Sequence, residues 1–223
     1  MTPIVEIEVV GERLLARGDR TLYWPAERTM FVADLHLGKG ASFRASGLPI
    51  PAGSTQGTLD ALGRAVEEAG AERLVVLGDL WHARSGRTEE NRELLARWRE
   101  VRPELRTSLV IGNHDRGAGW ELEAVPPGEA LGPFRLHHFP DPDPAGYVLS
   151  GHLHPGYRLD GKGGQSLRLP CFWFGQSVGV LPAFGELTGA MEIRPRESDR
   201  IVVVAEGRAA LVPMRDRFRA RWR

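Results

Sequence analysis

The chain has 223 residues, one cysteine, and 29 basic against 29 acidic side chains. This length fits one sizeable domain, and the balanced charge excludes a protein that binds nucleic acid or membranes through its net charge alone. The single cysteine excludes an internal disulfide, and no signal peptide or membrane-spanning segment is visible, so we expect a cytoplasmic protein that does not contact a membrane.

The N-terminal third predicts short strands followed by a helix. Apolar runs in residues 4–10, 14–17 and 21–24 are separated by turns, and residues 28–34 form a buried strand. Apolar side chains then recur at helical spacing from Leu59 to Ala69. This helix ends at Gly70, and Ser54 or Thr55 can cap its first turn.

The middle of the chain repeats the alternation of strand and helix. A strand is predicted over 74–77, a helix over 88–101, and a further strand over 105–111. A helix between two strands forms a right-handed crossover connection, so these strands should lie side by side and parallel.

Beyond residue 115 the helical periodicity fades. Apolar runs at 134–138, 147–149, 167–174, 187–193 and 201–204 predict mainly strands, arranged as a meander in a second sheet. The predicted fold class is therefore α/β, a β-sandwich flanked by helices, in one domain over 1–214. Cys171 and the aromatic residues 172–174 are expected in its core, with base stacking as the alternative for the aromatic residues.

An arginine-rich tail follows the predicted domain over 215–223, where arginines alternate with other residues that include Phe218 and Trp222. Such a strip suits a nucleic-acid backbone. A frayed or docked tail is the favoured alternative.

Polar clusters follow four of the predicted strands. They are Asp34-Leu35-His36, Gly78-Asp79, Gly112-Asn113-His114-Asp115 and Gly151-His152-Leu153-His154. A strand that runs into a loop with reactive side chains is how α/β folds build sites. Glycine before Asp79, Asn113 and His152 permits a sharp turn and the close approach of a ligand.

The mixture of carboxylate, amide and imidazole groups predicts two divalent metal ions, Mn²⁺ first, with Fe or Zn as alternatives. Asp34, His36 and His154 could hold one ion, Asp79 could bridge, and Asn113, His152 and a further histidine could hold the other. An extended backbone would place both side chains of Asp34-x-His36, and of His152-x-His154, on one face. Turn residues and surface histidines explain any single cluster but not four in series.

These motifs, D-x-H, G-D, G-N-H-D and G-H-x-H, resemble those of the calcineurin-like metallophosphoesterases over the whole domain. Longer segments resemble, within that superfamily, the ligase-associated DNA damage response endonuclease family PdeM; they are residues 37–39, 42–44, 78–82, 171–174 and 181–185. The resemblance implies a metallophosphoesterase-type sandwich with four αββα layers and a bacterial cytoplasmic enzyme. It also implies functional association with an ATP-dependent DNA ligase and a DExH helicase.

The resemblance implies one more histidine ligand, at the end of the strand before the G-H-x-H loop. His137 and His138 both fit this position. His138 is favoured because His138-Phe139-Pro140 resembles the usual strand-end pattern, and alternation would turn His137 to the opposite face.

The residues next to the predicted ligands suggest roles in catalysis. His114 is the predicted general acid, with Asp115 or a backbone group orienting its ring. Lys39, Arg44 and His82 could hold a phosphate diester. Solvated loop charge is the alternative for Lys39 and Arg44, and a packing or surface role is the alternative for His82.

The predicted function is a metal-dependent phosphodiesterase or endonuclease that hydrolyses accessible or single-stranded DNA in DNA repair. A phosphodiesterase or phosphatase acting on small nucleotides is the alternative, because a fold and a metal site do not determine the substrate. A scaffold without catalysis is disfavoured, since His114 and every expected type of ligand are present.

Overall fold

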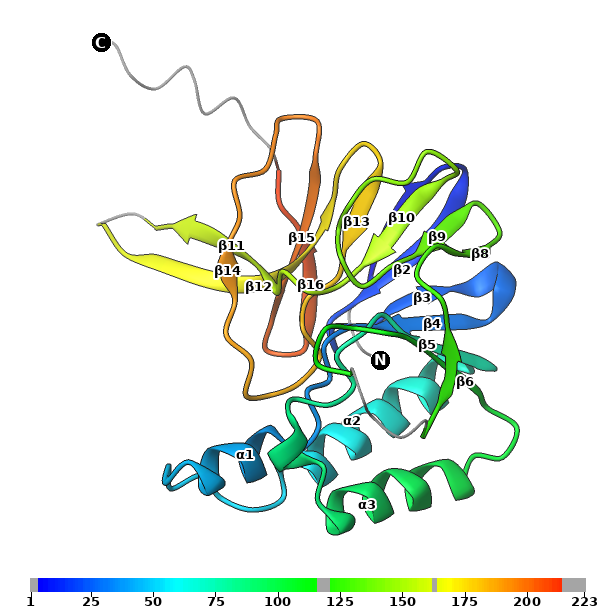
Figure 1. Ribbon diagram of the computed structural model, residues 1–223. Coiled ribbons are helices and arrows are strands. Elements are labelled where there is room, and N and C mark those ends of the chain that lie inside the picture. Colours follow the sequence, from blue (N-terminus) through cyan, green and yellow to red (C-terminus); the bar gives the residue numbers. More distant parts are fainter. Residues whose placement is uncertain (1–3, 116–120, 162–163, 214–223) are drawn as a thin grey trace.

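The computed structural model describes residues 4–115, 121–161 and 164–213 (Figure 1). Two β-sheets pack on each other, and the predicted α/β sandwich is confirmed. The predicted tail over 215–223 lies outside the described residues. No helix within them is long and apolar enough to cross a membrane.

The first sheet has the strand order β1-β2-β3-β4-β5-β6-β7. Its strands are β1 (Ile4–Val9), β2 (Glu12–Arg17), β3 (Leu22–Trp24), β4 (Thr29–Val32), β5 (Arg73–Val76), β6 (Arg106–Val110) and β7 (Glu123–Val125). Neighbours are antiparallel from β1 to β4 and parallel from β4 to β7. The predicted parallel arrangement of β4, β5 and β6 is therefore confirmed.

Two helices connect these parallel strands, as predicted: α2 (Ser54–Ala69) and α3 (Glu89–Glu100). Their buried residues, which include Leu59, Leu62 and Leu95, join the outer side of the first sheet in one apolar cluster. The prediction of the cap of α2 was wrong, because the residue before its first turn is Gly53, in a left-handed conformation. The Thr55 hydroxyl instead accepts a hydrogen bond from the Gly38 N–H at 3.1 Å.

A short helix, α1 (Lys39–Ala45), was not predicted. It has seven residues, among them Gly40 and Ser42, and therefore no periodic apolar face. It lies against the 3-10 helix Arg84–Gly86, where the Ser85 hydroxyl donates to the Ser42 hydroxyl of α1 at 3.1 Å. The chains approach closely here, since a Cβ on Gly38, the residue before α1, would lie 2.1 Å from the Gly86 carbonyl oxygen.

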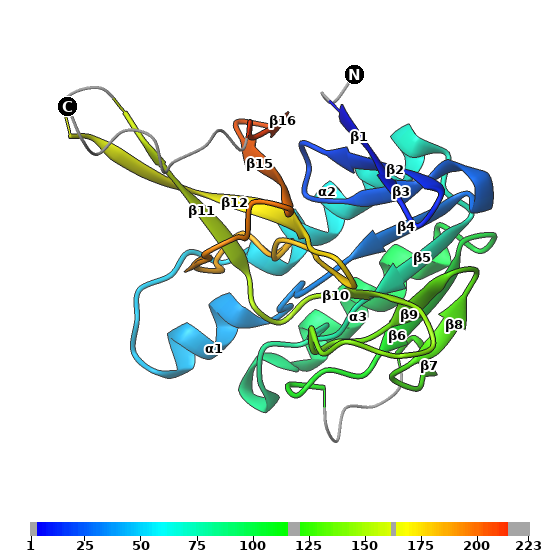
Figure 2. The ribbon, with the colours of Figure 1, turned by 90° about the horizontal axis from the view of Figure 1, so that it is seen from above.

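The second sheet has the order β14-β11-β12-β13-β10-β9-β8, and β15 pairs with β12 and β16. Its strands are β8 (Glu129–Leu131), β9 (Phe134–Leu136), β10 (Tyr147–Ser150), β11 (Pro155–Asp160), β12 (Ser166–Phe174), β13 (Val178–Val180), β14 (Met191–Glu192), β15 (Arg200–Ala205) and β16 (Arg208–Leu211). Figure 2 shows the β11–β12 hairpin extending away from the sheets.

Two predictions for this half were wrong. The sheet is not a meander, because β9, β10 and β13 are parallel neighbours although β11 and β12 lie between β10 and β13 in the chain. Within 187–193, only Met191–Glu192 form a strand. Local alternation indicates a strand but does not identify its partner.

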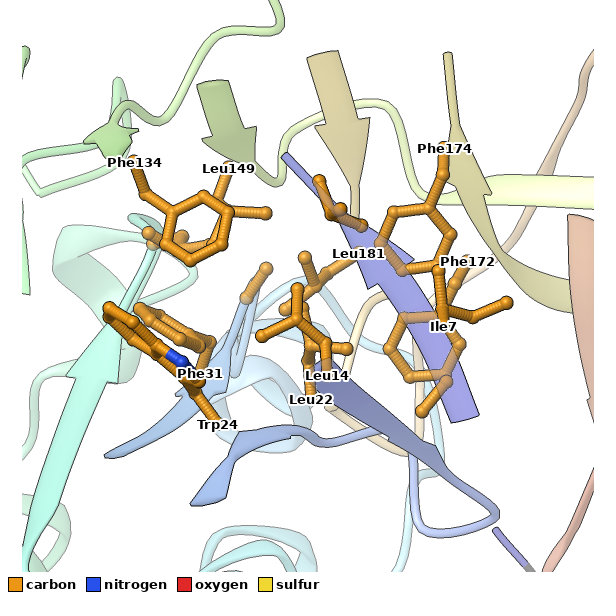
Figure 3. Close-up of a cluster of buried hydrophobic side chains, with 14 of the residues drawn as sticks. Ile7, Leu14, Leu22, Trp24, Phe31, Phe134, Leu149, Phe172, Phe174 and Leu181 are labelled. Carbon is orange, nitrogen blue, oxygen red and sulfur yellow. The ribbon is translucent and has the colours of Figure 1, made fainter. Parts of the chain in front are cut away.

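The main core lies between the two sheets (Figure 3). The Trp24 ring packs edge-on against Phe134, with 5.1 Å between centroids, and Phe172 and Phe174 stack at 6.3 Å. Cys171 is fully buried. The prediction of a core role is confirmed for Cys171, Phe172 and Phe174, and base stacking is excluded for the two phenylalanines. Trp173 is half-buried and packs against a smaller apolar cluster that contains Cys171.

The helices differ from the expected four layers. Figure 1 shows α1, α2 and α3 on one side of the molecule, and no α-helix follows β6 in the described residues. Among the residues that the structure describes, the outer face of the second sheet therefore has no helical layer. A smaller apolar cluster takes that place; it contains Tyr157, Cys171, Ile193, Ile201, Val203 and Val212. The physical reason is the absence of helical periodicity beyond residue 115.

Candidate metal centre

The predicted ligands follow the carboxyl ends of parallel strands in both sheets. β4, β5 and β6 precede Asp34, Asp79 and Asn113, and β9 and β10 precede His138 and His152. The Asp34 N–H donates to the Gly78 carbonyl oxygen at 3.1 Å, and the Gly151 N–H donates to that of His138 at 3.2 Å. Parallel strands carry their carboxyl ends to one edge, so these loops meet.

Asp34, His36 and His154 form what we call the first group. One ligand atom from each residue lies within 4.8 Å of the other two. The Nε2 atoms of His36 and His154 are 3.1 Å apart, and His154 Nε2 is 3.5 Å from Asp34 Oδ1. This group brings together the residues predicted for the first ion.

Asp79, Asn113, His138 and His152 form the second group. Ligand atoms of Asp79, His138 and His152 lie within 4.8 Å of one another. His138 Nε2 is 2.9 Å from Asn113 Oδ1, 3.1 Å from His152 Nδ1 and 3.4 Å from Asp79 Oδ1. His137 instead contacts Asp143 at 3.1 Å, so the structure places His138 in the group and His137 outside it.

The atoms that converge are mostly hydrogen-bond acceptors. Nδ1 of His138 lies 3.0 Å from the Leu77 carbonyl oxygen and donates to it, so Nε2 of the neutral ring carries no proton. Asp34 Oδ1 is buried without a hydrogen-bond partner. Buried acceptors that face one another are unfavourable unless a cation lies between them. Both groups therefore fit divalent ions that take oxygen and imidazole ligands.

Burial also shifts the pKa values of these side chains. It lowers the pKa of His36 to about 2, assisted by electrostatic repulsion from the neighbouring His154 and Lys39. It also lowers the pKa of His152. Burial raises the pKa of Asp79, which the nearby Asp34 carboxylate raises further. Neutral imidazoles are the form that binds metal ions.

The backbone at the ligands is left-handed rather than extended. The φ angles are 54° at Asp34, 48° at His36, 51° at Asp79, 69° at His152 and 46° at His154. An extended backbone was the condition for placing both side chains of Asp-x-His, and of His-x-His, on one face, and this condition is not met. Hydrogen bonds between the loops, such as the one from His36 N–H to the Asp79 carbonyl oxygen at 3.0 Å, hold this conformation. As a result, His152 and His154 enter different groups.

Three glycines make room for the ligands. A Cβ on Gly78 would lie 2.1 Å from His138 Nδ1, and one on Gly112 would lie 2.3 Å from Asp79 Oδ1. A Cβ on Gly151 would lie 2.7 Å from Asp34 Oδ2. The groups that approach these glycines are therefore side chains of the centre, and the predicted close approach of a bound ligand stays a prediction.

His114 lies beside the second group with its ring held by backbone. Its Nδ1 donates to the His82 carbonyl oxygen, and its Nε2 is 3.9 Å from Asp79 Oδ2. The buried Asp115 carboxylate instead accepts from the N–H groups of Gly112 at 3.0 Å and Trp81 at 3.2 Å. Of the two predicted ways to orient the ring, the structure shows the backbone contact, and Asp115 braces the loop.

Two of the three predicted substrate-binding residues lie at the centre. The rings of His82 and His114 stack with 5.7 Å between centroids. Burial and the Lys39 charge lower the pKa of His82 to about 4. Lys39 begins α1, and its ammonium group lies over the Phe43 ring at 5.7 Å. Arg44 is directed elsewhere, since it donates to the carbonyl oxygens of Ile50 and Pro51.

Two further residues of the centre were missed in the sequence. The guanidinium of Arg87, 9 % exposed, donates to the His114 carbonyl oxygen. The Phe139 ring is 41 % exposed and lies 4.6 Å from the His152 ring, centroid to centroid. No local pattern marks Arg87, because its contact joins segments 27 residues apart. Phe139 could have been found from its place beside His138.

Comparisons with known proteins gave a likeness among solved structures. No protein-family model matches the chain, and no curated protein sequence matches it. The structure is similar to the crystal structure of the Pseudomonas putida nuclease MPE, with a TM-score of 0.81 and 38 % sequence identity. The likeness covers 94 % of this chain and 100 % of that chain.

Proposed function

Because this chain belongs to the family of the Pseudomonas putida nuclease MPE, we propose that it is a metal-dependent nuclease that hydrolyses phosphodiester bonds in DNA. The observation that carries the proposal is the convergence of the first and second groups beside the His114 ring. The metal motifs and the sandwich fold support the metallophosphoesterase class within the hydrolases.

The two groups would hold two divalent ions. Asp34, His36 and His154 would hold one ion, and Asn113, His138 and His152 the other, with Asp79 as the shared ligand. When bound, such ions supply an activated water molecule and neutralise charge on the phosphoryl oxygens. We propose Mn²⁺, because the donors mix oxygen with imidazole and include no thiolate.

The side chains around the metal centre have separate roles in this proposal. His114 gives the proton to the departing oxygen from Nε2, since its Nδ1 is committed to the His82 carbonyl oxygen. Lys39 and His82 contact the phosphate diester from the α1 side. Asp115 and Arg87 hold the loop that carries His114.

The proposed substrate is accessible or single-stranded DNA, and the proposed setting is DNA repair. The resemblance of the longer segments to the PdeM family supports this setting. It also supports functional association with an ATP-dependent DNA ligase and a DExH helicase.

The test removes the metal with a chelator, restores Mn²⁺, and follows cleavage of labelled single-stranded DNA beside hydrolysis of a generic diester. His138→Ala should lose both activities, because it removes a ligand of the second group. His137→Ala is the matched control, since His137 pairs with Asp143 outside that group, and it should keep both.

Diester hydrolysis without DNA cleavage would contradict the proposal and favour a diesterase acting on small nucleotides. Absence of both activities in the Mn²⁺-loaded protein would favour the third alternative, a scaffold protein without catalytic activity.

A further inference from the structure

A pocket opens on the outer face of the second sheet, which no helix of the described residues covers. Its volume is about 390 Å³, and its wall includes Pro140, Leu153 and Val180. Leu153 lies between His152 and His154, and Pro140 follows His138 by two residues. We call this cavity the outer pocket. Its wall is thus continuous with the loops of the metal centre.

The inner surface of the outer pocket is mainly apolar and includes Trp173. The Trp173 indole N–H donates to Asp199 Oδ2 at 2.8 Å, which fixes the plane of the ring. The same oxygen accepts from the Arg196 N–H at 2.8 Å, and Asp199 is 5 % exposed. The Asp199 carboxylate therefore accepts hydrogen bonds from two residues of the pocket wall and holds them in position. A fixed aromatic ring among apolar groups suits the face of a nucleobase.

Two arginines, Arg194 and Arg196, also line the outer pocket, and both are exposed. Neither guanidinium forms an ion pair or a hydrogen bond with the part of the chain that the structure describes. Other arginines do pair, such as Arg28 with Glu72 at 2.5 Å. Two unpaired guanidinium groups beside an apolar surface suit the phosphates of a nucleic-acid strand.

Phe139 lies between the metal centre and the outer pocket along the chain. Its exposed ring contacts His152, and the next residue, Pro140, lines the pocket. A strand that leaves the metal centre on this side therefore meets an aromatic ring first and the outer pocket next. Stacking on aromatic side chains with arginines along the backbone is how proteins hold single strands.

We infer that the outer pocket binds the DNA strand on one side of the phosphate to be cut. One base lies against Trp173, and Arg194 and Arg196 contact the phosphates. This inference rests on the proposed nuclease function. It selects single-stranded DNA over duplex, because a base in a duplex is stacked and paired and cannot enter a pocket. The volume lies within the range of roughly 300–1,000 Å³ usual for ligand pockets.

The test is the double variant Arg194→Ala with Arg196→Ala, in the full-length protein loaded with Mn²⁺. The KM for single-stranded DNA should rise at least about tenfold, and kcat and hydrolysis of a generic diester should stay unchanged. The slope of log KM against log salt concentration should fall by about 1.4, since each phosphate neutralised on a single strand contributes about 0.7. Folding should persist, because both side chains are exposed and make no bonds within the described residues.

The matched control is Arg64→Ala with Arg97→Ala. Both residues are exposed on α2 and α3, in the helical layer, and the change in net charge is the same. The control should leave KM and the salt slope unchanged.

An unchanged KM and slope in the double variant, while the parent protein cuts DNA, would overturn the inference and leave the proposed function standing. Equal effects in the two double variants would also overturn it, because net charge would then explain them. A parent protein that hydrolyses the generic diester but not DNA would refute the proposed function instead.

Discussion

A main-chain oxygen holds the His114 ring, and this contact sets which nitrogen can move a proton. Nδ1 donates to the His82 carbonyl oxygen, so Nε2 faces Asp79 at 3.9 Å. The carboxylate of Asp115 is turned into the loop, where two N–H groups occupy it. At the scale of single residues, the proposed metal ligands and the proposed general acid are therefore different side chains. A single substitution can remove the acid and leave the ligands in place.

His114→Ala should lower kcat for DNA cleavage by about 10²–10⁴, the usual contribution of a general acid. The Mn²⁺ content should stay that of the parent protein, because His114 belongs to neither group. Metal analysis and steady-state kinetics on one preparation measure both. Full Mn²⁺-dependent activity in this variant would remove His114 from the proposed role.

Gly78→Ala should reduce Mn²⁺ occupancy as well as stability. The new Cβ would lie 2.1 Å from His138 Nδ1, at a φ of +84°. Gly11→Ala is the matched control, because Gly11 has the same φ of +84° and nothing within 4 Å of its Cβ. Both variants should lose about 1–2 kcal/mol of unfolding free energy from the left-handed backbone. Metal titration should show lost affinity in Gly78→Ala alone, and equal affinities would show that His138 does not need this space.

At the scale of elements, contacts between helices and loops build the centre. The Thr55 hydroxyl on α2 accepts from the buried N–H of Gly38, the residue before α1. Through this bond α2 sets where α1 starts, and Lys39 is its first residue. A helix of seven residues is not stable alone, so its position depends on such contacts.

Thr55→Val should cost about 1–3 kcal/mol of unfolding free energy, because the buried Gly38 N–H loses its partner. It should also raise the KM for DNA, since α1 carries Lys39. Thr55→Ser keeps the hydroxyl and serves as the control in urea unfolding and kinetics. If the Val and Ser variants were equally stable, the hydrogen bond would not hold α1.

For the whole molecule, the metal centre is a set of buried groups gathered from both sheets, and its ionisation is linked to folding. Burial holds the pKa of His36 at about 2 in the folded chain, against 6.5 for the free side chain. A lowered folded pKa means that the unfolded chain binds the proton more tightly. The contribution of neutral His36 to the free energy of unfolding is therefore fully present above pH 6.5, and it is lost as the pH falls from 6.5 toward 2.

The metal-free protein should consequently lose unfolding free energy relative to His36→Gln as the pH falls from 7.5 to 5. The comparison isolates His36, because the lowered pKa values of His82 and His152 and the raised pKa values of Asp79 and Asp115 contribute in both proteins. Urea unfolding in chelator at several pH values measures the difference. A difference that stays constant over this range would show that His36 is not held neutral by folding.

The sequence by itself determined the sandwich of strands and helices and most of the residues at the centre. Hydrophobic periodicity predicts strands and helices locally. The position of polar residues just after predicted strands identified Asp34, Asp79, Asn113 and His152 as candidate ligands. The glycines beside them could also be predicted, because their role is to leave space within one turn of the chain.

Only the tertiary structure placed His138, and not His137, beside Asp79 and His152. It also paired β10 with β13, and within the described residues it put no helix on the second sheet. It also turned Arg44 toward its own loop and joined Arg87 to the segment of His114. Each of these outcomes depends on contacts between segments far apart in the chain. Local periodicity and spacing carry no information about such contacts, since they describe neighbours along the chain and not neighbours in space.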